Sequence, residues 1–304
     1  MRAFDRESDG PERSSLGVDL GVGTESRKVL IYKNQILIQF MKLATWNVNS
    51  LAVRLPQVLD WLAVNQPDAL CLQETKLTDE KFPDTELAAA GYVCEWFGQR
   101  TYNGVALLTR VASGLVATKV VKNIPGLDDP QSRVITATLG GSHASGVRLV
   151  GAYIPNGQAP DSEKFEYKMR WLTALRDWLA IEIVAHPNLV LVGDYNIAPE
   201  DRDVHDPVLW AGQVLCTPQE RAHFQGLISL GLHDAFRLFD QAPKTWSWWD
   251  YRMLAFRKNQ GLRIDHILVS DALKAKVTSC VIDKLPRKNE RPSDHAPVVV
   301  ELGF

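Results

Sequence analysis

Six apolar runs of this sequence begin or end in Asn, Asp, Glu or His, where a strand that simply meets solvent would carry Lys. The polar residues at these ends are Asn47 and Asn49, Glu74, Asn156, Asp194 and Asn196, Asp265, and Asp294 with His295. Each alone is typical of a turn, because Asn and Asp form turns readily. Strand ends also meet at the edges of sheets, where loops on a rigid scaffold form binding and catalytic sites. Six such ends together therefore predict a single site.

The side chains of this set indicate metal chemistry. Carboxylate and amide oxygens without a thiolate suit Mg²⁺, with Mn²⁺ as the alternative, better than they suit zinc. The candidate metal ligands are Asn47, Glu74, Asp194, Asn196, Asp294 and His295. A divalent cation among carboxylates is suited to phosphoryl transfer, because it neutralises the phosphoryl oxygens while a base activates water. The sequence contains neither a Gly-Lys-Ser/Thr phosphate loop nor a Gly-x-Ser-x-Gly nucleophile elbow.

Asp265 and His295 form the natural pair within this set. A carboxylate that accepts a hydrogen bond from one ring nitrogen of a histidine fixes its tautomer and raises its pKa, which favours an imidazolium facing a phosphate. Asp194 is then expected to be the base that activates water. In the competing interpretation His295 is a core histidine whose hydrogen bonds are satisfied. That interpretation leaves Asp265 without an explanation, so we favour the pair.

The elements that must position these residues are short strands interrupted by a few helices. The expected strands are Leu43–Val48, Ala69–Leu72, Val93–Phe97, Val105–Leu108, Val134–Leu139, Val147–Ile154, Leu189–Val192, Ile264–Val269, Val277–Ile282 and Val298–Leu302. Apolar residues follow helical spacing after Leu55, from Trp171 to Ile183 and around Phe224. Many of the strands are too apolar to face water on either side. We therefore expect an α/β protein with a four-layer α/β sandwich, in which two mixed β-sheets pack face to face and are flanked by helices.

One catalytic domain is expected over residues 41–304, because no repeat or interior linker interrupts them. Residues 1–40 are interpreted as an N-terminal extension. Its Gly, Ser and charge content predicts disorder, and the alternative is a start codon assigned too early. Within it, residues 27–40 are apolar enough for a short extended segment.

Bulk properties exclude few classes of function. Four cysteines lie far apart among 304 residues, which favours a reducing compartment and argues against structural zinc. No apolar stretch approaches the roughly 20 residues of a membrane span, so a cytoplasmic protein without a membrane partner is expected. The net charge is −2, yet residues 244–295 carry eleven Lys and Arg against six Asp and Glu. This local excess of five positive charges favours a phosphate-bearing ligand.

Eight motifs, in order along residues 41–304, resemble the exonuclease III family of DNA-repair nucleases, within the endonuclease/exonuclease/phosphatase superfamily. The motifs are Trp-Asn-Val-Asn-Ser (46–50), Leu-Gln-Glu-Thr-Lys (72–76), Tyr-Asn-Gly-Val-Ala-Leu-Leu-Thr (102–109), Tyr-Ile-Pro-Asn-Gly (153–157), Gly-Asp-Tyr-Asn-Ile-Ala-Pro (193–199), Trp-Ser-Trp-Trp-Asp-Tyr-Arg (246–252), Gly-Leu-Arg-Ile-Asp (261–265) and Pro-Ser-Asp-His-Ala-Pro (292–297). Ordered matches at eight places are more specific than any single motif. The resemblance implies the four-layer fold and Mg²⁺-dependent cleavage of duplex DNA at 3′ ends and abasic sites, which leaves a 3′-hydroxyl.

The resemblance also implies roles for individual residues. Glu74 matches the principal metal ligand, Asp194 the base, Asn196 the residue that orients the phosphate, and Tyr153 the tyrosine against the scissile phosphate. The expected catalytic residues are Tyr153, Asp194, Asn196, Asp265 and His295, and the expected DNA-binding residues are Asn49, Arg133, Asn156, Trp248, Tyr251, Arg252 and Arg263. Aromatic side chains wedge or stack against bases while cations hold phosphates. The expected partner is double-stranded DNA, bound by a monomer.

Two other functions stay open at this point. The superfamily includes phosphatases of inositol and lipid phosphates with similar catalytic residues, so the catalytic set does not name the substrate. A non-catalytic DNA-binding module would show a degraded site, whereas every catalytic position here holds a chemically competent residue.

The sequence also bears on the balance between abasic-site incision and 3′-end processing. Val-Leu-Cys at 214–216 replaces a Gly-Lys-Cys element of other members, and our hypothesis is that Leu215 hinders a flipped abasic sugar and leaves 3′-end processing dominant.

Overall fold

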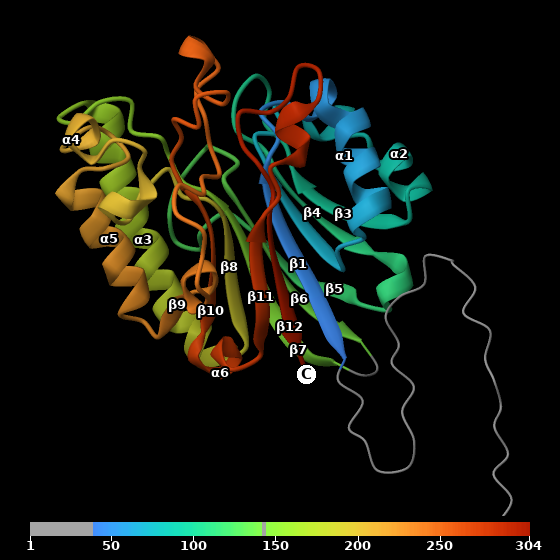
Figure 1. Cartoon of the computed structure of the whole chain (residues 1–304). Helices are drawn as coiled ribbons and strands as arrows, with labels where there is room; N and C mark the ends of the chain where they lie inside the picture. The colour runs from blue at the N-terminus through green and yellow to red at the C-terminus, as the bar shows by residue number, and fades with distance from the viewer. Residues whose placement is uncertain (1–38, 142–143) are drawn as a thin grey trace, which may run out of the picture. The chain divides into compact units, whose positions relative to one another are not determined.

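The computed structural model describes residues 39–141 and 144–304, which form two six-stranded sheets (Figure 1). The first sheet has the order β11-β12-β1-β2-β4-β3 and the second the order β5-β6-β7-β8-β10-β9. The strands of the first sheet are β1 (Phe40–Asn47), β2 (Ala69–Gln73), β3 (Tyr92–Phe97), β4 (Val105–Arg110), β11 (Val277–Ile282) and β12 (Val298–Gly303). Those of the second are β5 (Val116–Lys122), β6 (Val134–Gly141), β7 (Ala144–Tyr153), β8 (Leu189–Asp194), β9 (Leu232–Asp234) and β10 (Asp265–Ser270).

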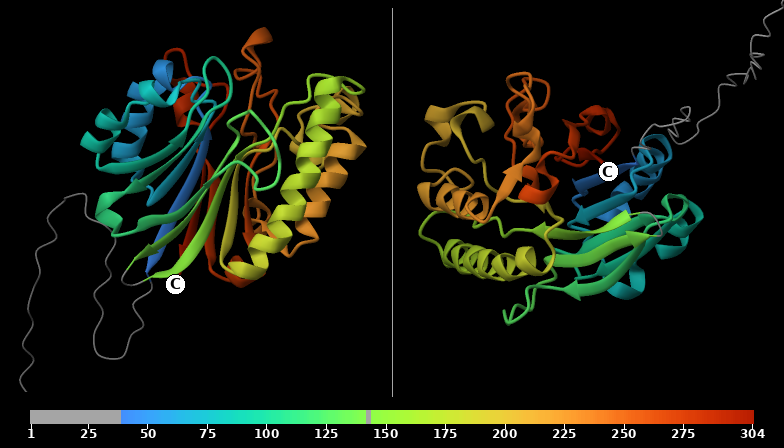
Figure 2. Two further views of the ribbon diagram at one scale, coloured as in Figure 1. Left: turned by 180° about the vertical axis from the view of Figure 1, so that it is seen from behind. Right: turned by 90° about the horizontal axis from the view of Figure 1, so that it is seen from below.

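Helices cover the outer faces of both sheets, as the two views of Figure 2 show. The helices are α1 (Leu51–Asn65), α2 (Asp84–Ala89), α3 (Glu163–Ala185), α4 (Pro207–Trp210), α5 (Pro218–Ile228) and α6 (Asp271–Lys274). Ser162 caps α3 by accepting a hydrogen bond from the Phe165 amide, and Thr217 forms a capping box with Glu220 at the start of α5. None of the described helices is long and apolar enough to cross a membrane.

Three apolar clusters hold the four layers together. The central cluster lies between the sheets and draws on both, with Leu43 and Leu107 from the first and Leu149 and Val192 from the second, all fully buried. A second cluster joins the second sheet to α3 and α5, and a third joins the first sheet to α1. Each fully buried aliphatic side chain contributes about 1.5–3 kcal/mol through removal of apolar surface from water. The predicted four-layer α/β sandwich is confirmed.

All ten predicted strands are present, but β5 and β9 were not predicted. β5 is an edge strand whose sequence, Val-Ala-Thr-Lys-Val-Val-Lys, is mostly exposed and is broken by an irregularity in its pairing with β6. β9 has three residues. Edge strands and very short strands lack the apolar run that sequence patterns detect. The predicted extension, residues 1–40, lies outside the described residues except for its last two, and β1 begins at Phe40.

Strand directions bring the polar strand ends to one edge of the sandwich. β1 is parallel to β2, and β7 is parallel to β8, so the carboxyl ends of these four strands point the same way in each sheet. β12 is antiparallel to β1 and β10 is antiparallel to β8, so it is their first residues that reach that edge. We call this edge the rim. It is the upper end of the molecule in Figure 1.

Candidate active site

Pairing register places three of the predicted catalytic residues side by side. Asp194, the last residue of β8, is paired with Tyr153 at the end of β7 and with Asp265 at the start of β10. Gly193 makes this possible, because a Cβ there would lie 1.8 Å from the carbonyl oxygen of Ala152 on β7. Its φ of +149° also suits glycine alone. Glycine at this position therefore allows β7 and β8 to approach closely next to the catalytic carboxylate.

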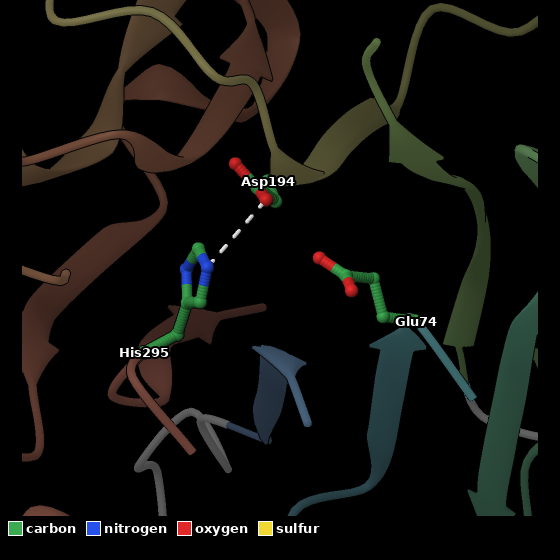
Figure 3. Close-up of side chains that lie close together, drawn as sticks. All are labelled: Glu74, Asp194 and His295. Atoms are coloured by element: carbon green, nitrogen blue, oxygen red, sulfur yellow. Dashed lines mark ion pairs between the residues drawn. The ribbon is translucent and has the colours of Figure 1, made fainter. Parts of the chain in front are cut away.

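The first sheet contributes Asn47 and Glu74 to the same place. The Asn47 side-chain amide donates to Glu74 Oε1 at 2.8 Å and to Asp194 Oδ2 at 2.9 Å, so it bridges carboxylates from both sheets. Glu74, Asp194 and His295 each offer one ligand atom within 4.8 Å of the others (Figure 3). The two carboxylates, with an amide beside them, are suitable ligands for a hard divalent cation, and the imidazole joins them only when its facing nitrogen is deprotonated. The donor set of the rim thus fits a metal.

His295 lies between two carboxylates. Its Nδ1 is 2.9 Å from Asp265 Oδ2 and 3.1 Å from Oδ1, and its Nε2 is 3.8 Å from Asp194 Oδ2. Burial by itself would lower the pKa of His295, but the negative charges of Asp265 and Asp194 outweigh burial and raise this pKa to about 10. The ring is therefore an imidazolium at neutral pH, with one N–H held by Asp265 and the other turned toward Asp194.

Asp194 and Tyr153 both hold protons more tightly than usual. Burial raises the pKa of Asp194, and the positive charge of His295 only partly opposes this effect. The Asp194 carboxylate also accepts hydrogen bonds from the backbone and side-chain amides of Asn196. Burial, with the charges of Glu74 and Asp194, raises the pKa of Tyr153 well above its usual value. Tyr153 is thus a hydrogen-bond donor across the physiological range, and Asp194 is a carboxylate able to accept a proton.

A buried lysine supports the two loops that follow β7 and β8. Lys168 of α3 is fully buried and its Nζ donates to the carbonyls of Asn156 at 3.1 Å and Asn196 at 2.6 Å. It also forms an ion pair with Glu220 of α5 at 2.5 Å. On the rim side, the Asn156 amide donates to Asn196 Oδ1 at 2.9 Å. These contacts fix the main chain on which Asn196 sits.

Asp294 lies apart from the Glu74, Asp194 and His295 group. Its oxygens accept hydrogen bonds from Asn49 Nδ2 at 2.9 Å and from Trp248 Nε1 at 3.0 Å. The Asn49 main chain, in turn, donates to Asn47 Oδ1. Asp294 is thus linked to Asn47 through Asn49, and it is not among the three residues whose ligand atoms lie within 4.8 Å of one another.

Comparisons with known proteins agree with this geometry. The profile described as "Endonuclease/Exonuclease/phosphatase family" matches residues 44–295. Exodeoxyribonuclease III of Haemophilus influenzae is 35% identical over 271 residues, which cover 86% of this chain and 100% of that protein. The chain belongs to the exonuclease III branch of this family. The resemblance indicated by the eight sequence motifs is confirmed.

Solved structures of the exonuclease III branch share the fold. The 3′-5′ exonuclease NExo from Neisseria meningitidis is 48% identical, with a TM-score of 0.82 over 87% of this chain and 100% of that chain. NExo from Neisseria, described as a 3′ phosphatase, has also been solved bound to a product DNA hairpin, with the same identity, coverage and TM-score. An AP endonuclease from Archaeoglobus fulgidus is 33% identical, with a TM-score of 0.79 over 86% of this chain and 98% of that chain.

Within this exonuclease III fold, the predicted DNA-binding residues separate by exposure. Asn156, Tyr251 and Arg252 are exposed, and Asn49 and Trp248 are half-buried beside Asp294. Arg252 forms an ion pair with Asp250 at 2.6 Å and keeps 85% of its side chain in solvent. These five residues remain available to a DNA strand at the rim.

The other two predicted DNA contacts are buried in the structure. Arg263 is 1% exposed and forms ion pairs with Asp203 at 2.7 Å and Asp234 at 2.8 Å, so it is buried just before β10. Arg133 is 7% exposed, donates to the Tyr153 carbonyl and lies over the Tyr153 ring at 4.9 Å. It supports the tyrosine, and little of its surface is free for a phosphate. Net charge counts cannot distinguish a buried arginine from an exposed one.

Two residues of the site were not predicted. Lys76 follows Glu74 by two positions, and its Nζ is 2.9 Å from Glu74 Oε2. Lys168 holds the loops after β7 and β8 from below. The motif Leu-Gln-Glu-Thr-Lys contained a signal for Lys76, since a cation two residues from a ligand carboxylate is within reach. Nothing in the helical pattern of α3 distinguished Lys168 from a solvent-exposed lysine.

Proposed function

We propose that this exonuclease III-type DNA-repair nuclease is Mg²⁺-dependent and acts chiefly at the 3′ ends of duplex DNA, as a monomer. The observation that carries the proposal is the meeting of Glu74, Asp194 and His295 at one rim, with Asp265 behind the histidine. Hydrolysis of a phosphodiester needs a base for water, a positive charge for the phosphoryl oxygens and a cation to bind the phosphate. The rim supplies the first two and ligands for the third.

The residues of this chain divide the reaction between them. Glu74 and Asp194, with Asn47 beside them, would hold a divalent cation, which when bound neutralises phosphoryl oxygen charge. Asp194 accepts a proton from the attacking water as the new oxygen–phosphorus bond forms. His295 faces the phosphoryl oxygens with Nε2–H while Asp265 holds its Nδ1–H. The bond from phosphorus to the 3′ oxygen breaks, and that oxygen takes up a proton to leave a 3′-hydroxyl.

Leu215 supports the preference for 3′ ends, although not in the way the sequence suggested. The side chain does not project from the binding face, since only 5% of it is exposed. It packs with Leu262 and Ile264 in a cluster against which Trp248 lies, and Trp248 donates to Asp294. Leu215 thus packs behind the rim, and its effect on an abasic sugar would pass through Trp248. The relative with 48% identity is a 3′-5′ exonuclease, in line with this proposal.

Product analysis of the purified protein tests the proposal. Two labelled duplexes, one with a recessed 3′ end and one with an internal abasic site, are incubated at one fixed salt concentration with Mg²⁺ or with EDTA. We expect shortening of the recessed 3′ end at least ten times faster than abasic-site incision, and no product with EDTA. Equal rates on both duplexes contradict the 3′-end preference. Intact DNA combined with phosphate release from inositol or lipid phosphates contradicts the nuclease assignment itself.

A further inference from the structure

A cavity opens beside the rim, between two segments that the catalytic mechanism does not use. Its volume is about 430 Å³, and it is lined by residues of the 250–257 loop and of the 287–292 segment. In Figure 1 these are the orange loop and the red turn, both at the upper end of the molecule. Three cations, Arg257, Arg287 and Lys288, and two aromatic side chains, Tyr251 and Phe256, line it.

Arg287 is the buried cation in the lining of this cavity. Only 6% of it is exposed, and its guanidinium lies 4.9 Å from the centre of the Phe256 ring and 5.8 Å from that of Tyr251. One of its terminal nitrogens donates to the Ser293 carbonyl, but its Nε has no hydrogen-bond partner among the described residues. The guanidinium forms no ion pair with a carboxylate of the described residues, although the residue lines the cavity. A buried cation is costly unless an opposite charge balances it, and a ligand that supplies this charge is an anion.

The charges around Arg287 are uncompensated. Arg257 and Lys288 are exposed and form no ion pair with any described residue. Asp250 is the single acidic residue of the lining, and it already forms an ion pair with Arg252 at 2.6 Å. The cavity therefore attracts an anion while its two rings offer a flat apolar surface, a combination typical of nucleotide binding.

The cavity is linked to the candidate active site by hydrogen bonds of Tyr251, which lines it together with Pro292. The Tyr251 hydroxyl donates to the Pro292 carbonyl at 2.9 Å and lies 3.3 Å from Asn49 Nδ2, and Asn49 also donates to Asp294. A strand that leaves the rim over Asn49 and Tyr251 reaches the cavity next.

We propose that this cavity is a phosphate subsite for the DNA strand, occupied by a phosphodiester that is not the one being cut. The inference rests on the proposed nuclease function and adds where a flanking nucleotide binds. Arg257, Arg287 and Lys288 hold its phosphate, and Tyr251 and Phe256 contact its sugar or base. The mononucleotide that the reaction releases also carries a phosphate and could bind here. The test therefore distinguishes the DNA strand from the released mononucleotide.

The experiment compares Arg257→Gln and Lys288→Gln with Lys274→Gln, an exposed lysine of α6. Binding of a recessed-end duplex is measured over a series of salt concentrations with Ca²⁺ in place of Mg²⁺. Each lost phosphate contact lowers the slope of log K against log salt by about 1. We expect that decrease for Arg257→Gln and Lys288→Gln and the wild-type slope for Lys274→Gln. Inhibition of the Mg²⁺ reaction by added deoxynucleoside monophosphate should stay unchanged in all three.

Two results overturn this subsite. Unchanged salt slopes in both Arg257→Gln and Lys288→Gln would show that the DNA strand does not bind in the cavity. Unchanged slopes together with at least a three-fold weaker inhibition by the monophosphate assign the cavity to the released product instead. Either outcome leaves the nuclease function standing as long as the wild-type protein cuts the duplex, whereas a wild type that cuts nothing removes the proposed function before the variants are compared.

Discussion

The charge on His295 is the property of a single residue on which the reaction depends most. Asp265 and Asp194 both raise its pKa, so it remains an imidazolium where a free histidine would be largely neutral. A positive charge held in a buried site and aimed at a phosphate lowers the barrier more than the same charge in water, because little solvent screens it.

Substitution of His295 by Ala should lower kcat/KM on a recessed-end duplex by about 10²–10⁴-fold, the range for loss of one acid–base group. Asp265→Asn is the informative companion, because it keeps the ring and removes the anion that raises its pKa. Activity that requires the imidazolium is present below its pKa and lost above it, so the basic limb of the pH–rate profile should move to lower pH in Asp265→Asn. An unmoved basic limb would mean that Asp265 does not act through His295.

Leu215 offers a second test at a single position. Its φ is +76°, a conformation that suits glycine, so Leu215→Gly relieves the backbone while it empties the space behind Trp248. We expect the rate of abasic-site incision to rise about ten-fold relative to 3′-end trimming in the product assay. Leu227→Ala, a buried truncation in the cluster under α3 and α5, is the control for lost stability and should leave the ratio unchanged. A constant ratio in Leu215→Gly would separate this residue from the choice of substrate.

At the scale of elements, α3 and α5 do more than cover the second sheet. The Lys168–Glu220 ion pair joins the two helices under the site, and both side chains are fully buried. Burial lowers the pKa of Lys168, while Glu220 opposes that effect. Because the same ammonium also binds the Asn156 and Asn196 carbonyls, the helices and the catalytic loops are fixed to one point.

Lys168→Met should therefore affect stability and rate together. Removal of one partner of a buried ion pair costs about 3–5 kcal/mol of unfolding free energy, since Glu220 is left buried and charged. We also expect kcat to fall at least ten-fold with a small change in KM, because Lys168 positions Asn196 and does not contact the substrate. Arg170→Met is the matched control on the same helix, where the side chain is 69% exposed. A variant with reduced stability but an unchanged kcat would restrict Lys168 to a structural role.

The sequence predicted the strands and the polar residues of the rim. It did not predict which charged residues are buried beneath the rim. Long apolar runs identified ten strands, and the polar residues at their ends met as expected because the carboxyl ends of the parallel strands and the first residues of the antiparallel β10 and β12 reach one edge. Arg263 and Arg133 are predicted to contact DNA and yet are buried, because the sequence around an arginine does not show whether it faces DNA or a partner such as Asp203. Lys168 was missed for the same reason. Long-range partners determine the burial of a charge, and one sequence contains no record of those partners.

At the scale of the whole molecule, the catalytic site depends on two sheets remaining packed against each other. Asn47 and Glu74 belong to one sheet and Asp194 and Asp265 to the other, so any loosening of the central cluster separates the catalytic residues. Stability and activity should therefore fall together when conditions weaken the packing between the sheets. Buried titratable groups make pH such a condition.

His266 predicts how that stability depends on pH. Burial, together with the positive charge of Arg263, lowers the pKa of His266 to about 4, and its Nε2 is 2.9 Å from the Ile197 carbonyl beside Asn196. In the unfolded chain this histidine takes up a proton near pH 6.5, but in the folded chain only near pH 4. The unfolded state thus binds more protons between these values, and stability falls by roughly 3 kcal/mol as pH drops through that window.

Comparison with His266→Gln isolates this contribution. Asp194, whose pKa is raised, takes up a proton more readily when folded and so opposes the loss in the same window. That opposing effect is common to both proteins and cancels in the difference between them. Urea unfolding at pH 7 and pH 4.5 should show the wild type losing about 2–3 kcal/mol more than His266→Gln. Parallel losses in the two proteins would show that folding does not lower the pKa of His266, in conflict with the 2.9 Å contact between its Nδ1 and the Arg263 guanidinium.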